Sequence, residues 1–443
     1  MSTTILAGGL AVVLLGSNPA LANSDLAESD TTANLDSTPA RSSVDPPPLP
    51  LNELLGLSGS GRSAYFTKDK SFSGNTGYGI ASIWATASPK ELWGIKTYFD
   101  ARIQDQNLSR NSRASFDLRE GYAQSTFGDI DVRAGRQITV WGRADKINPT
   151  DSWTTRDFRL LAPNDEDQRI GVTSLQGTWN VGAYHLIGLW QPEWRYPGLP
   201  TPTLPGVSFQ NVPPANPARQ FGLKLDHSGQ GTDWSVSYAR AIDRTPDLSV
   251  LSTGPRGVQL GFLYQKLDVL GADGAVPIGN FGLRGELAYT RTKDHDGNDP
   301  LTKNSNLFVV LGCERTFDGV LNVNVQYLYR RTFDFQERKA ISNPNTSLLA
   351  QQVDILSNQL AQDMHGASLR INYKAFNETL EIELAGVTWF NKSDSAIRPK
   401  VTYAISDRLK GILGGEIYHG PADTFFGRLN KTTTAYAELQ IGF

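Results

Sequence analysis

The feature that most constrains the fold of this chain is a two-residue period of hydrophobicity that recurs along most of its length. In "WGIKTYFDARIQ" (93–104), apolar or small side chains alternate with Lys, Tyr, Asp, Arg and Gln. The segments "LNVNVQYLYR" (321–330) and "ASLRINYKAF" (367–376) alternate in the same way. Because successive side chains of a strand point to opposite faces, each segment predicts a strand with one apolar and one polar face.

The connections between these segments alternate between short turns and long polar loops. The short turns lie near residues 88–91, 127–130, 180–182, 228–233, 275–280, 317–320, 376–379 and 406–408, and the long loops near 67–77, 107–113, 142–168, 194–218, 243–256, 294–304, 335–364, 391–396 and 420–430. Outer-membrane barrels have short periplasmic turns and long external loops. The pattern predicts an all-β protein: a single transmembrane antiparallel β-barrel of about 18 strands in residues 51–443, with 16 strands as the alternative count.

The two ends of the chain fit an exported barrel. "ILAGGLAVVLLG" followed by the small-residue pattern at Ala20 to Ala22 predicts a signal peptide in residues 1–22, although no basic residue precedes it. A buried N-terminal element is the alternative. Residues 23–50, rich in Pro, Ser and Thr, predict a disordered periplasmic linker. No later stretch is apolar enough for a transmembrane helix, so the expected location is a bacterial outer membrane.

The last strand, "TTTAYAELQIGF", has alternating apolar residues and ends on Phe443. It resembles the closing-strand signal of Gram-negative outer-membrane proteins, which the assembly machinery recognises. The resemblance implies that the barrel-assembly machinery binds through Phe443, and that outer-membrane lipid and lipopolysaccharide surround the barrel.

A secreted β-sandwich or propeller is the competing architecture. Its strands rarely reach the 11 to 14 residues that this chain supports. Aromatic residues near the expected strand ends also favour interfacial girdles: Trp84, Trp93, Trp141, Trp190, Trp194, Tyr418 and Phe425.

Composition argues against several functions. The net charge of −3 and the lack of a basic run speak against nucleic-acid binding. A single cysteine, Cys313, excludes a disulfide framework. No H-E-x-x-H motif, G-x-S-x-G motif or phosphate-binding glycine loop occurs, and the five histidines are scattered. We therefore expect neither an enzyme nor a cofactor or metal site.

Residues 142–169, "GRADKINPTDSWTTRDFRLLAPNDEDQR", form the best functional candidate because they combine opposite charges with the apolar side chains of Trp153, Phe158, Leu160 and Leu161. A solvated external loop would not need those anchors. This is the third long loop, and it resembles the loop that general porins fold into the lumen. The resemblance implies a charged constriction.

The candidate pore-lining residues come from this loop and from the polar strand faces. They are Lys96, Asp100, Arg102, Asp117, Arg119, Arg133, Arg143, Asp145, Lys146, Asp151, Arg156, Asp157, Asp165, Asp167, Arg169, Arg330 and Arg370, with Asn322, Asn324 and Lys374 in the same ladders. The alternative for about half of the strand charges is an ion pair that only fills polar space.

The stretch "FDLREGYAQSTFGDIDVRAGRQITVWGRADKINPTD" (116–151) carries a family resemblance. It is similar to a succession of L-R-E-x-Y, G-R-Q, W-G and I-N-P-x-D in a family of uncharacterised proteobacterial outer-membrane proteins. The match covers about residues 115–170. The G-R-Q element also resembles alginate-export barrels, but the arginine-rich sequence that follows it in that group is missing here.

Arg136 breaks the alternation because it falls on the apolar face of its strand. An unpaired arginine facing lipid near the midplane costs ~2–4 kcal/mol. A hairpin centred on Gly128 would place Glu120 opposite Arg136 as a structural pair. Three explanations stay open: a paired charge facing lipid, a patch covered by a neighbouring barrel, or a bulge at Gly135 that turns Arg136 inward, which we favour.

The sequence thus predicts a porin-like channel for passive passage of small hydrophilic solutes, constricted by loop 142–168. Two alternatives stay open: an export conduit for a polysaccharide or other polymer that works with a periplasmic partner, and a barrel that sheathes an electron-transfer cytochrome. Segment 345–364 predicts a helix that packs on the rim or plugs the pore. Assembly into homo-oligomers is left open.

Overall fold

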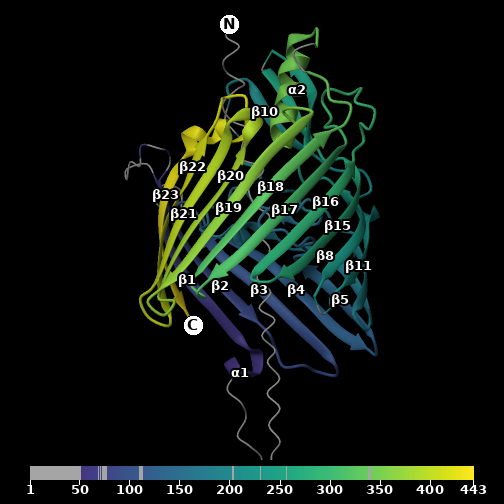
Figure 1. Ribbon diagram of the computed structural model, residues 1–443. Coiled ribbons are helices and arrows are strands. Elements are labelled where there is room, and N and C mark those ends of the chain that lie inside the picture. Colours follow the sequence, from purple (N-terminus) through teal and green to yellow (C-terminus); the bar gives the residue numbers. More distant parts are fainter. Residues whose placement is uncertain are drawn as a thin grey trace, which may run out of the picture.

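The computed structural model describes residues 51–443, except 68, 70, 72–76, 109–112, 202–203, 230, 256 and 338–340. One antiparallel sheet of 18 strands closes on itself, because β23 (Thr434–Gly442) pairs with β1 (Leu57–Phe66) (Figure 1). The predicted transmembrane barrel and its strand count are confirmed. The predicted signal peptide, residues 1–22, and linker, residues 23–50, lie outside the described residues.

The barrel strands follow one another around the wall in chain order. After β1 come β2 (Tyr78–Ala87), β3 (Ile95–Asp105), β4 (Ser115–Phe127), β5 (Ile130–Gln137), β8 (Val172–Val181), β9 (Tyr184–Gln191), β11 (Gln220–His227) and β12 (Asp233–Ile242). The second half consists of β15 (Lys266–Ile278), β16 (Phe281–Arg291), β17 (Asn306–Phe317), β18 (Leu321–Thr332), β19 (Asp363–Ala375), β20 (Leu380–Trp389), β21 (Asp394–Ala404), β22 (Leu409–His419) and β23.

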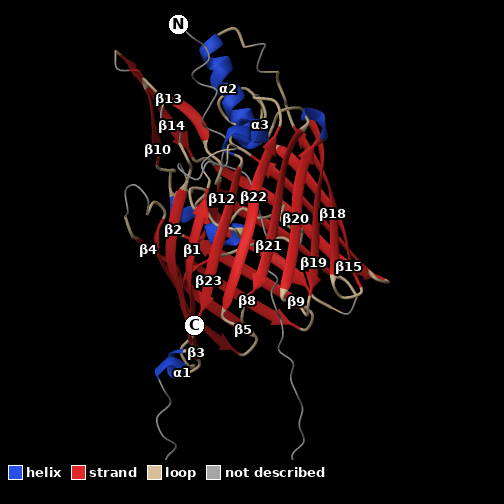
Figure 2. Ribbon diagram, turned by 90° about the vertical axis from the view of Figure 1, so that its left-hand side faces the viewer, coloured by secondary structure: helices blue, strands red, loops and turns tan. Residues whose placement is uncertain are grey.

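Short turns close one end of the barrel and long loops the other, as predicted (Figure 2). The short helix α1 (Leu51–Leu55) lies at the turn end. The loop end carries α2 (Pro344–Ser357), α3 (Phe425–Leu429) and a small sheet of β10 (Val207–Val212), β13 (Asp247–Gly254) and β14 (Gly257–Leu263). The predicted helix 345–364 is therefore shorter than expected, and the loop after β12 contains two strands.

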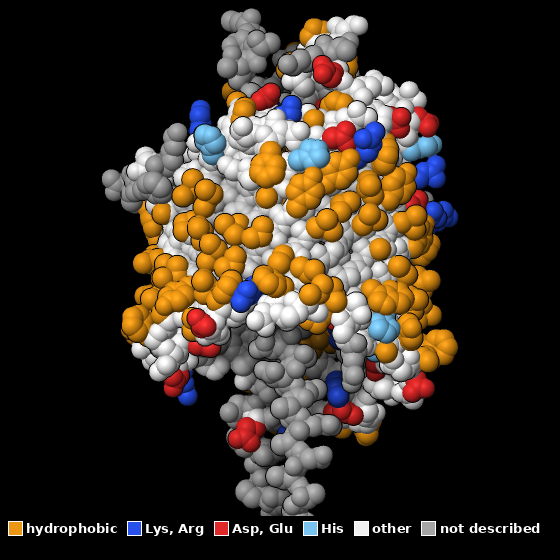
Figure 3. Space-filling view, viewed as in Figure 1, with side chains coloured by type: hydrophobic (Ala, Val, Ile, Leu, Met, Phe, Trp, Pro, Cys, Tyr) orange, Lys and Arg blue, Asp and Glu red, His pale blue; other side chains and the backbone are white. Residues whose placement is uncertain are grey.

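The outer surface of the wall is apolar. Figure 3 shows a broad belt of apolar side chains around the middle of the barrel. Ile103, Leu270 and Leu413 are each at least half exposed on this belt. Arg102, which precedes Ile103 on β3, and Gln326 on β18 are buried inside, which gives a polar lumen. A closed barrel with an apolar belt and a polar interior spans a bacterial outer membrane.

No helix in the described part of the chain is long and apolar enough to cross a membrane.

One part of the inner wall departs from this polar pattern. Phe308 on β17, Leu328 on β18 and Trp389 on β20 point inward and are buried with Ile355 of α2 and Phe426 of α3. Burial of these side chains, at roughly 25 cal/mol per Å² of apolar surface, holds both helices on the loop end of the wall.

The register of β4 and β5 corrects one prediction. The turn is centred between Gly128 and Asp129, so Arg136 lies opposite Gly121 and not opposite Glu120. The predicted structural pair of Glu120 and Arg136 is wrong. Glu120 instead accepts a hydrogen bond from the backbone N–H of Ile138 at 2.8 Å.

Arg136 lies on the outward-facing side of β5, two residues after the exposed Ala134. The pairing of β5 with both neighbours runs through Gly135 without interruption, so the favoured bulge at Gly135 is also wrong. The irregularity lies on β4, where Arg119 is the extra residue opposite Asp100 and Ala101. Arg136 Nη2 lies 3.4 Å from a carboxylate oxygen of Glu193, so it is a paired charge at the end of its strand.

Candidate functional site

The connection between β5 and β8, which we call the inner loop (residues 138–171), lies inside the barrel. Arg143 pairs with Asp226 on β11 at 2.7 Å and with Asp273 on β15. At the other end of the loop, Asp167 pairs with Arg62 on β1 at 2.8 Å. Strands β1 and β15 lie half-way round the ring from each other. The inner loop therefore spans the lumen from one wall to the opposite wall.

Glu286 on β16 anchors the first turn of the inner loop. One carboxylate oxygen accepts the backbone N–H groups of Arg143 at 3.1 Å and Ala144 at 3.0 Å. The other accepts the N–H and the hydroxyl of Thr150, both at 2.8 Å. A buried carboxylate with four donors is fully satisfied, so this turn is held at a fixed place on the wall.

Three further pairs tie the loop to the wall between β19 and β21. Asp145 pairs with Arg370 at 2.7 Å, and Lys146 lies 3.4 Å from Glu383 on β20. Asp165, in a short 3₁₀ helix, pairs with Arg398 on β21. Pairs of opposite charge at these separations retain their attraction in the partly buried lumen.

The last part of the loop rests on a cluster of arginines on β1, β3 and β4. The guanidinium carbons of Arg62, Arg102 and Arg119 lie 4.1, 5.1 and 5.0 Å from the centre of the Trp84 ring. Arg102 donates to the carbonyl oxygen of Asp167 at 2.7 Å. The face of the Trp84 ring and the carbonyl oxygens of the loop thus both stabilise the positive charges of these neighbouring arginines.

Carboxylates on the strands neutralise part of this cluster. Arg102 pairs with Asp117 at 3.0 Å, and Arg119 pairs with Asp100 at 2.6 Å. Four of the predicted pore-lining residues therefore lie together, and the two arginines among them donate to carbonyl oxygens of the inner loop.

Four predicted loop residues have local contacts. Asp151 accepts the backbone N–H groups of residues 153 and 154, and Asp157 pairs with Arg159 at 2.8 Å. Arg156 and Arg169 face each other across the two-stranded ribbon of β6 (Thr155–Arg156) and β7 (Arg169–Ile170). Trp153 and Leu160 are buried, as anchors of a packed loop must be.

Other predicted residues lie away from the loop. Lys96 is 73% exposed near the turn end, 3.8 Å from Glu91. Arg133 donates to Gln124 and lies over the Tyr122 ring. Lys374 pairs with Glu378, and Asn322 donates to Glu314.

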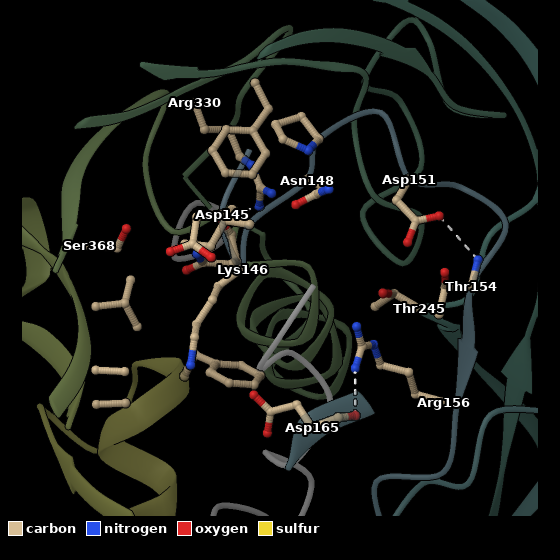
Figure 4. A pocket seen from close by; sticks show the side chains of 18 of the residues that line it. Asp145, Lys146, Asn148, Asp151, Thr154, Arg156, Asp165, Thr245, Arg330 and Ser368 are labelled. Carbon is tan, nitrogen blue, oxygen red and sulfur yellow. Dashed lines mark hydrogen bonds between the residues drawn. The ribbon is translucent and has the colours of Figure 1, made fainter. Parts of the chain in front are cut away.

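A cavity of about 350 Å³ lies between the inner loop and the β17–β21 wall (Figure 4). Figure 4 places Asp145 and Lys146 on one side of it and Thr154, Arg156 and Thr245 on the other. Arg330, Arg370 and Asn324 also line it, so three predicted strand residues belong to this site. A second cavity, of about 420 Å³, lies by residues 158–168, beside β22 and β23.

Sequence reasoning missed several residues of the site. Glu286, Glu383 and Arg398 lie at inward positions of regular strands, so extending the alternation along β16, β20 and β21 could have found them. Arg244 lies in a loop and lines the first cavity. No pattern in the sequence marks Arg244.

Three solved structures share this barrel fold. OccAB3 of Acinetobacter baumannii has a TM-score of 0.54 at 9% identity, over 87% of this chain and 98% of that chain. OccAB1 of the same organism has a TM-score of 0.53 at 10% identity, over 87% and 96%. OccK2 (OpdF) of Pseudomonas aeruginosa has a TM-score of 0.51 at 11% identity, also over 87% and 96%.

At these identities the likeness shows a shared porin-like barrel fold. No curated protein matches the sequence of this chain. Residues 19–366 match the model of a family described as "Protein of unknown function (DUF1302)", and because the match covers most of the chain, the protein belongs to that family.

Proposed function

We propose that this protein is a passive outer-membrane channel for small hydrophilic solutes, and that the inner loop is its charged constriction. The observation that carries the proposal is the span of the loop, from Arg143 at β11 and β15 to Asp167 at β1. A segment held on opposite walls narrows the lumen and sets its charge. No reaction is required of it.

The charges of the loop support selection by sign. The loop directs Arg143 at acidic wall residues on one side, and Asp145 and Asp165 at wall arginines on the other. A solute that passes the loop moves between these charged groups. Their placement, together with the width of the opening, decides which solutes enter.

The comparison structures offer a guide to the solute class. OccK2 was solved in complex with glucuronate, which is a small hydrophilic acid. We extend this to the present chain as a proposal that small hydrophilic acids are among its solutes.

Conductance in planar bilayers tests the proposal. We expect stable open channels from the purified barrel, and liposome swelling that falls as sugars and anions of increasing size are tested. A barrel that stays closed until a periplasmic partner is added would support the export conduit instead. Co-purification of a haem protein would support the cytochrome sheath.

A further inference from the structure

The cavity between the inner loop and the β17–β21 wall is lined by six basic and four acidic side chains, so basic groups are in excess. Arg156, Arg244 and Arg330 all line it. Within the described part of the chain, no carboxylate oxygen lies within 4.0 Å of any of the three guanidinium groups. By contrast, Arg370 and Arg398 in the same cavity pair with Asp145 and Asp165. The three unpaired arginines therefore differ from their neighbours.

The unpaired arginines also lack acceptors for part of their N–H groups. Arg156 donates through Nη1 to the carbonyl oxygen of Asp165 at 2.9 Å, and Arg330 donates through Nη1 to that of Ser357 at 2.9 Å. Nη2 of Arg156, Nε and Nη1 of Arg244 and Nε of Arg330 are buried and have no hydrogen-bond partner among the described residues. A buried donor without a partner costs about 1–3 kcal/mol, and more when the group is charged.

Burial also disfavours the charged form of two of these guanidinium groups. It lowers the pKa of Arg156, which has Arg169 beside it, to about 10, and it lowers the pKa of Arg244 to about 10. Both groups stay protonated at neutral pH, and Asp151, which favours the charged form of both, lies more than 4.0 Å from either guanidinium group. Arg156 extends toward the centre of the opening in Figure 4.

The part of the cavity wall beside Arg330 is aromatic. Phe308, Trp389, Phe425 and Phe426 line it and are buried from bulk water. The guanidinium carbon of Arg330 lies 4.3 Å from the centre of the Phe308 ring, and that ring lies 6.2 Å from the Trp389 ring. These side chains hold α2 and α3 on the wall, and they also present an aromatic surface to the cavity.

We propose that this cavity is a binding site for a small amphiphilic carboxylate with an aromatic or alicyclic body. The carboxylate lies at Arg330, beside the aromatic wall, and accepts the Nε–H that lacks a partner, while Arg156 and Arg244 add positive charge to the cavity. The ring lies against Phe308, Trp389 and the phenyl groups of α3. A guanidinium and a carboxylate form short, charge-assisted hydrogen bonds, and an aromatic surface binds a ring by burial and stacking. Few ligands except an amphiphilic acid satisfy both halves of the cavity.

This inference rests on the proposed channel, because the cavity adjoins the inner loop, and it names a solute class for the same lumen. The cavity volume of about 350 Å³ lies within the range of small-molecule sites. The acid would reside there during passage, so its entry would hinder the flow of small ions.

Isothermal titration calorimetry of the full barrel in detergent tests the site with three probes. We expect 3-phenylpropionate to bind saturably. We expect 3-phenylpropan-1-ol, which lacks the charge, and glucuronate, which lacks the ring, to bind at least about tenfold more weakly. Empty micelles correct for partition of the probes into detergent. Equal binding of the acid and the alcohol would overturn the proposal.

Matched variants locate the site. Arg330→Gln and Arg156→Gln should each weaken binding of 3-phenylpropionate by about tenfold or more, and Trp389→Leu should weaken it without affecting glucuronate. Arg331→Gln is the control, because Arg331 follows Arg330 on β18 but pairs with Asp363 on the outer face. Each variant is first shown to be folded by its heat-modifiable migration. Undiminished affinity in folded Arg330→Gln and Arg156→Gln barrels would overturn the site.

Channel recordings separate this inference from the proposed function. In the wild-type barrel 3-phenylpropionate should reduce the KCl current, and in Arg330→Gln it should not. Conducting channels that neither bind nor respond to the acid would refute the site and leave the channel standing. Saturable binding to a barrel that never conducts would refute the channel and leave the site standing.

Discussion

Glu286 on the barrel wall accepts hydrogen bonds from both the backbone N–H and the side-chain hydroxyl of Thr150, each at 2.8 Å. With the N–H groups of residues 143 and 144, this single carboxylate holds the turn that positions the inner loop. One strand residue thus holds the first turn of the proposed constriction, which leads to a direct test.

Glu286→Gln should loosen the inner loop. A glutamine amide has one acceptor and presents N–H donors where two backbone N–H groups point, and hydrogen bonds to a charged group contribute ~1.5–3 kcal/mol each. We expect larger conductance and more current noise in single-channel recordings. Glu314→Gln is the control, because Glu314 pairs with Arg284 on the wall. Quiet, wild-type currents in Glu286→Gln would contradict the anchoring role.

Arg143→Ala should change ion selectivity. The substitution leaves Asp273 without an ion pair and Asp226 with Lys224 alone, so the negative charge in the lumen increases. The reversal potential in a KCl gradient should shift toward cation selectivity. Arg240→Ala serves as the control, because Arg240 pairs with Asp268 on the outer face. An unchanged reversal potential would place Arg143 outside the ion path.

Gly135→Ala should damage the barrel more than Arg136→Ala. Gly135 has a φ of +131°, and a Cβ there would come within 2.5 Å of the carbonyl oxygen of Gly121. Such strain costs on the order of 1–3 kcal/mol. The half-exposed pair of Arg136 with Glu193 contributes only about 0–1 kcal/mol. Urea unfolding followed by tryptophan fluorescence compares the two, and the reverse order of stability would refute this account.

The external sheet of β10, β13 and β14 should weaken as pH rises. Burial raises the pKa of Asp247 to about 6, while Lys303 at 3.7 Å favours its charged form and Asp243 opposes it. The folded sheet therefore binds the proton more tightly than the unfolded segment. Its stabilisation is complete below about pH 4 and is lost as pH rises through 6, a change on the order of 3 kcal/mol.

Hydrogen exchange over residues 247–263, corrected for intrinsic rates, measures this change. Protection should fall between pH 5 and pH 8 in the wild type and stay constant in Asp247→Asn. The same fall in both proteins would assign the effect to another group.

The alternation of the strands and the lengths of their connections were enough to predict a closed barrel of 18 strands with short turns at one end and long loops at the other. Both are local properties. A strand between lipid and a polar lumen must alternate apolar and polar side chains, and this alternation can be recognised in the sequence without knowledge of the tertiary structure. The loop at residues 142–168 was also recognisable, because its charges and its buried Trp153 are adjacent in the chain.

The pairing of Glu120 with Arg136 could not be read in this way. When the centre of a hairpin turn shifts by half a residue, every cross-strand partner changes by one residue. Nothing in "FGDI" distinguishes a turn centred on Gly128 from one centred between Gly128 and Asp129. The extra residue at Arg119 on β4 likewise depends on how that strand meets β3.

The partners of the inner loop were decided only by the tertiary structure. Arg143 meets Asp226 and Asp273, 83 and 130 residues away, because the ring brings those strands to one wall. The same closure places Arg330 4.3 Å from the centre of the Phe308 ring, with no carboxylate oxygen of the described residues within 4.0 Å of its guanidinium group. By itself the sequence determined which side chains face the lumen, because that follows from a period of two; only closure of the barrel determined which of them meet, because ion pairing depends on distance in space.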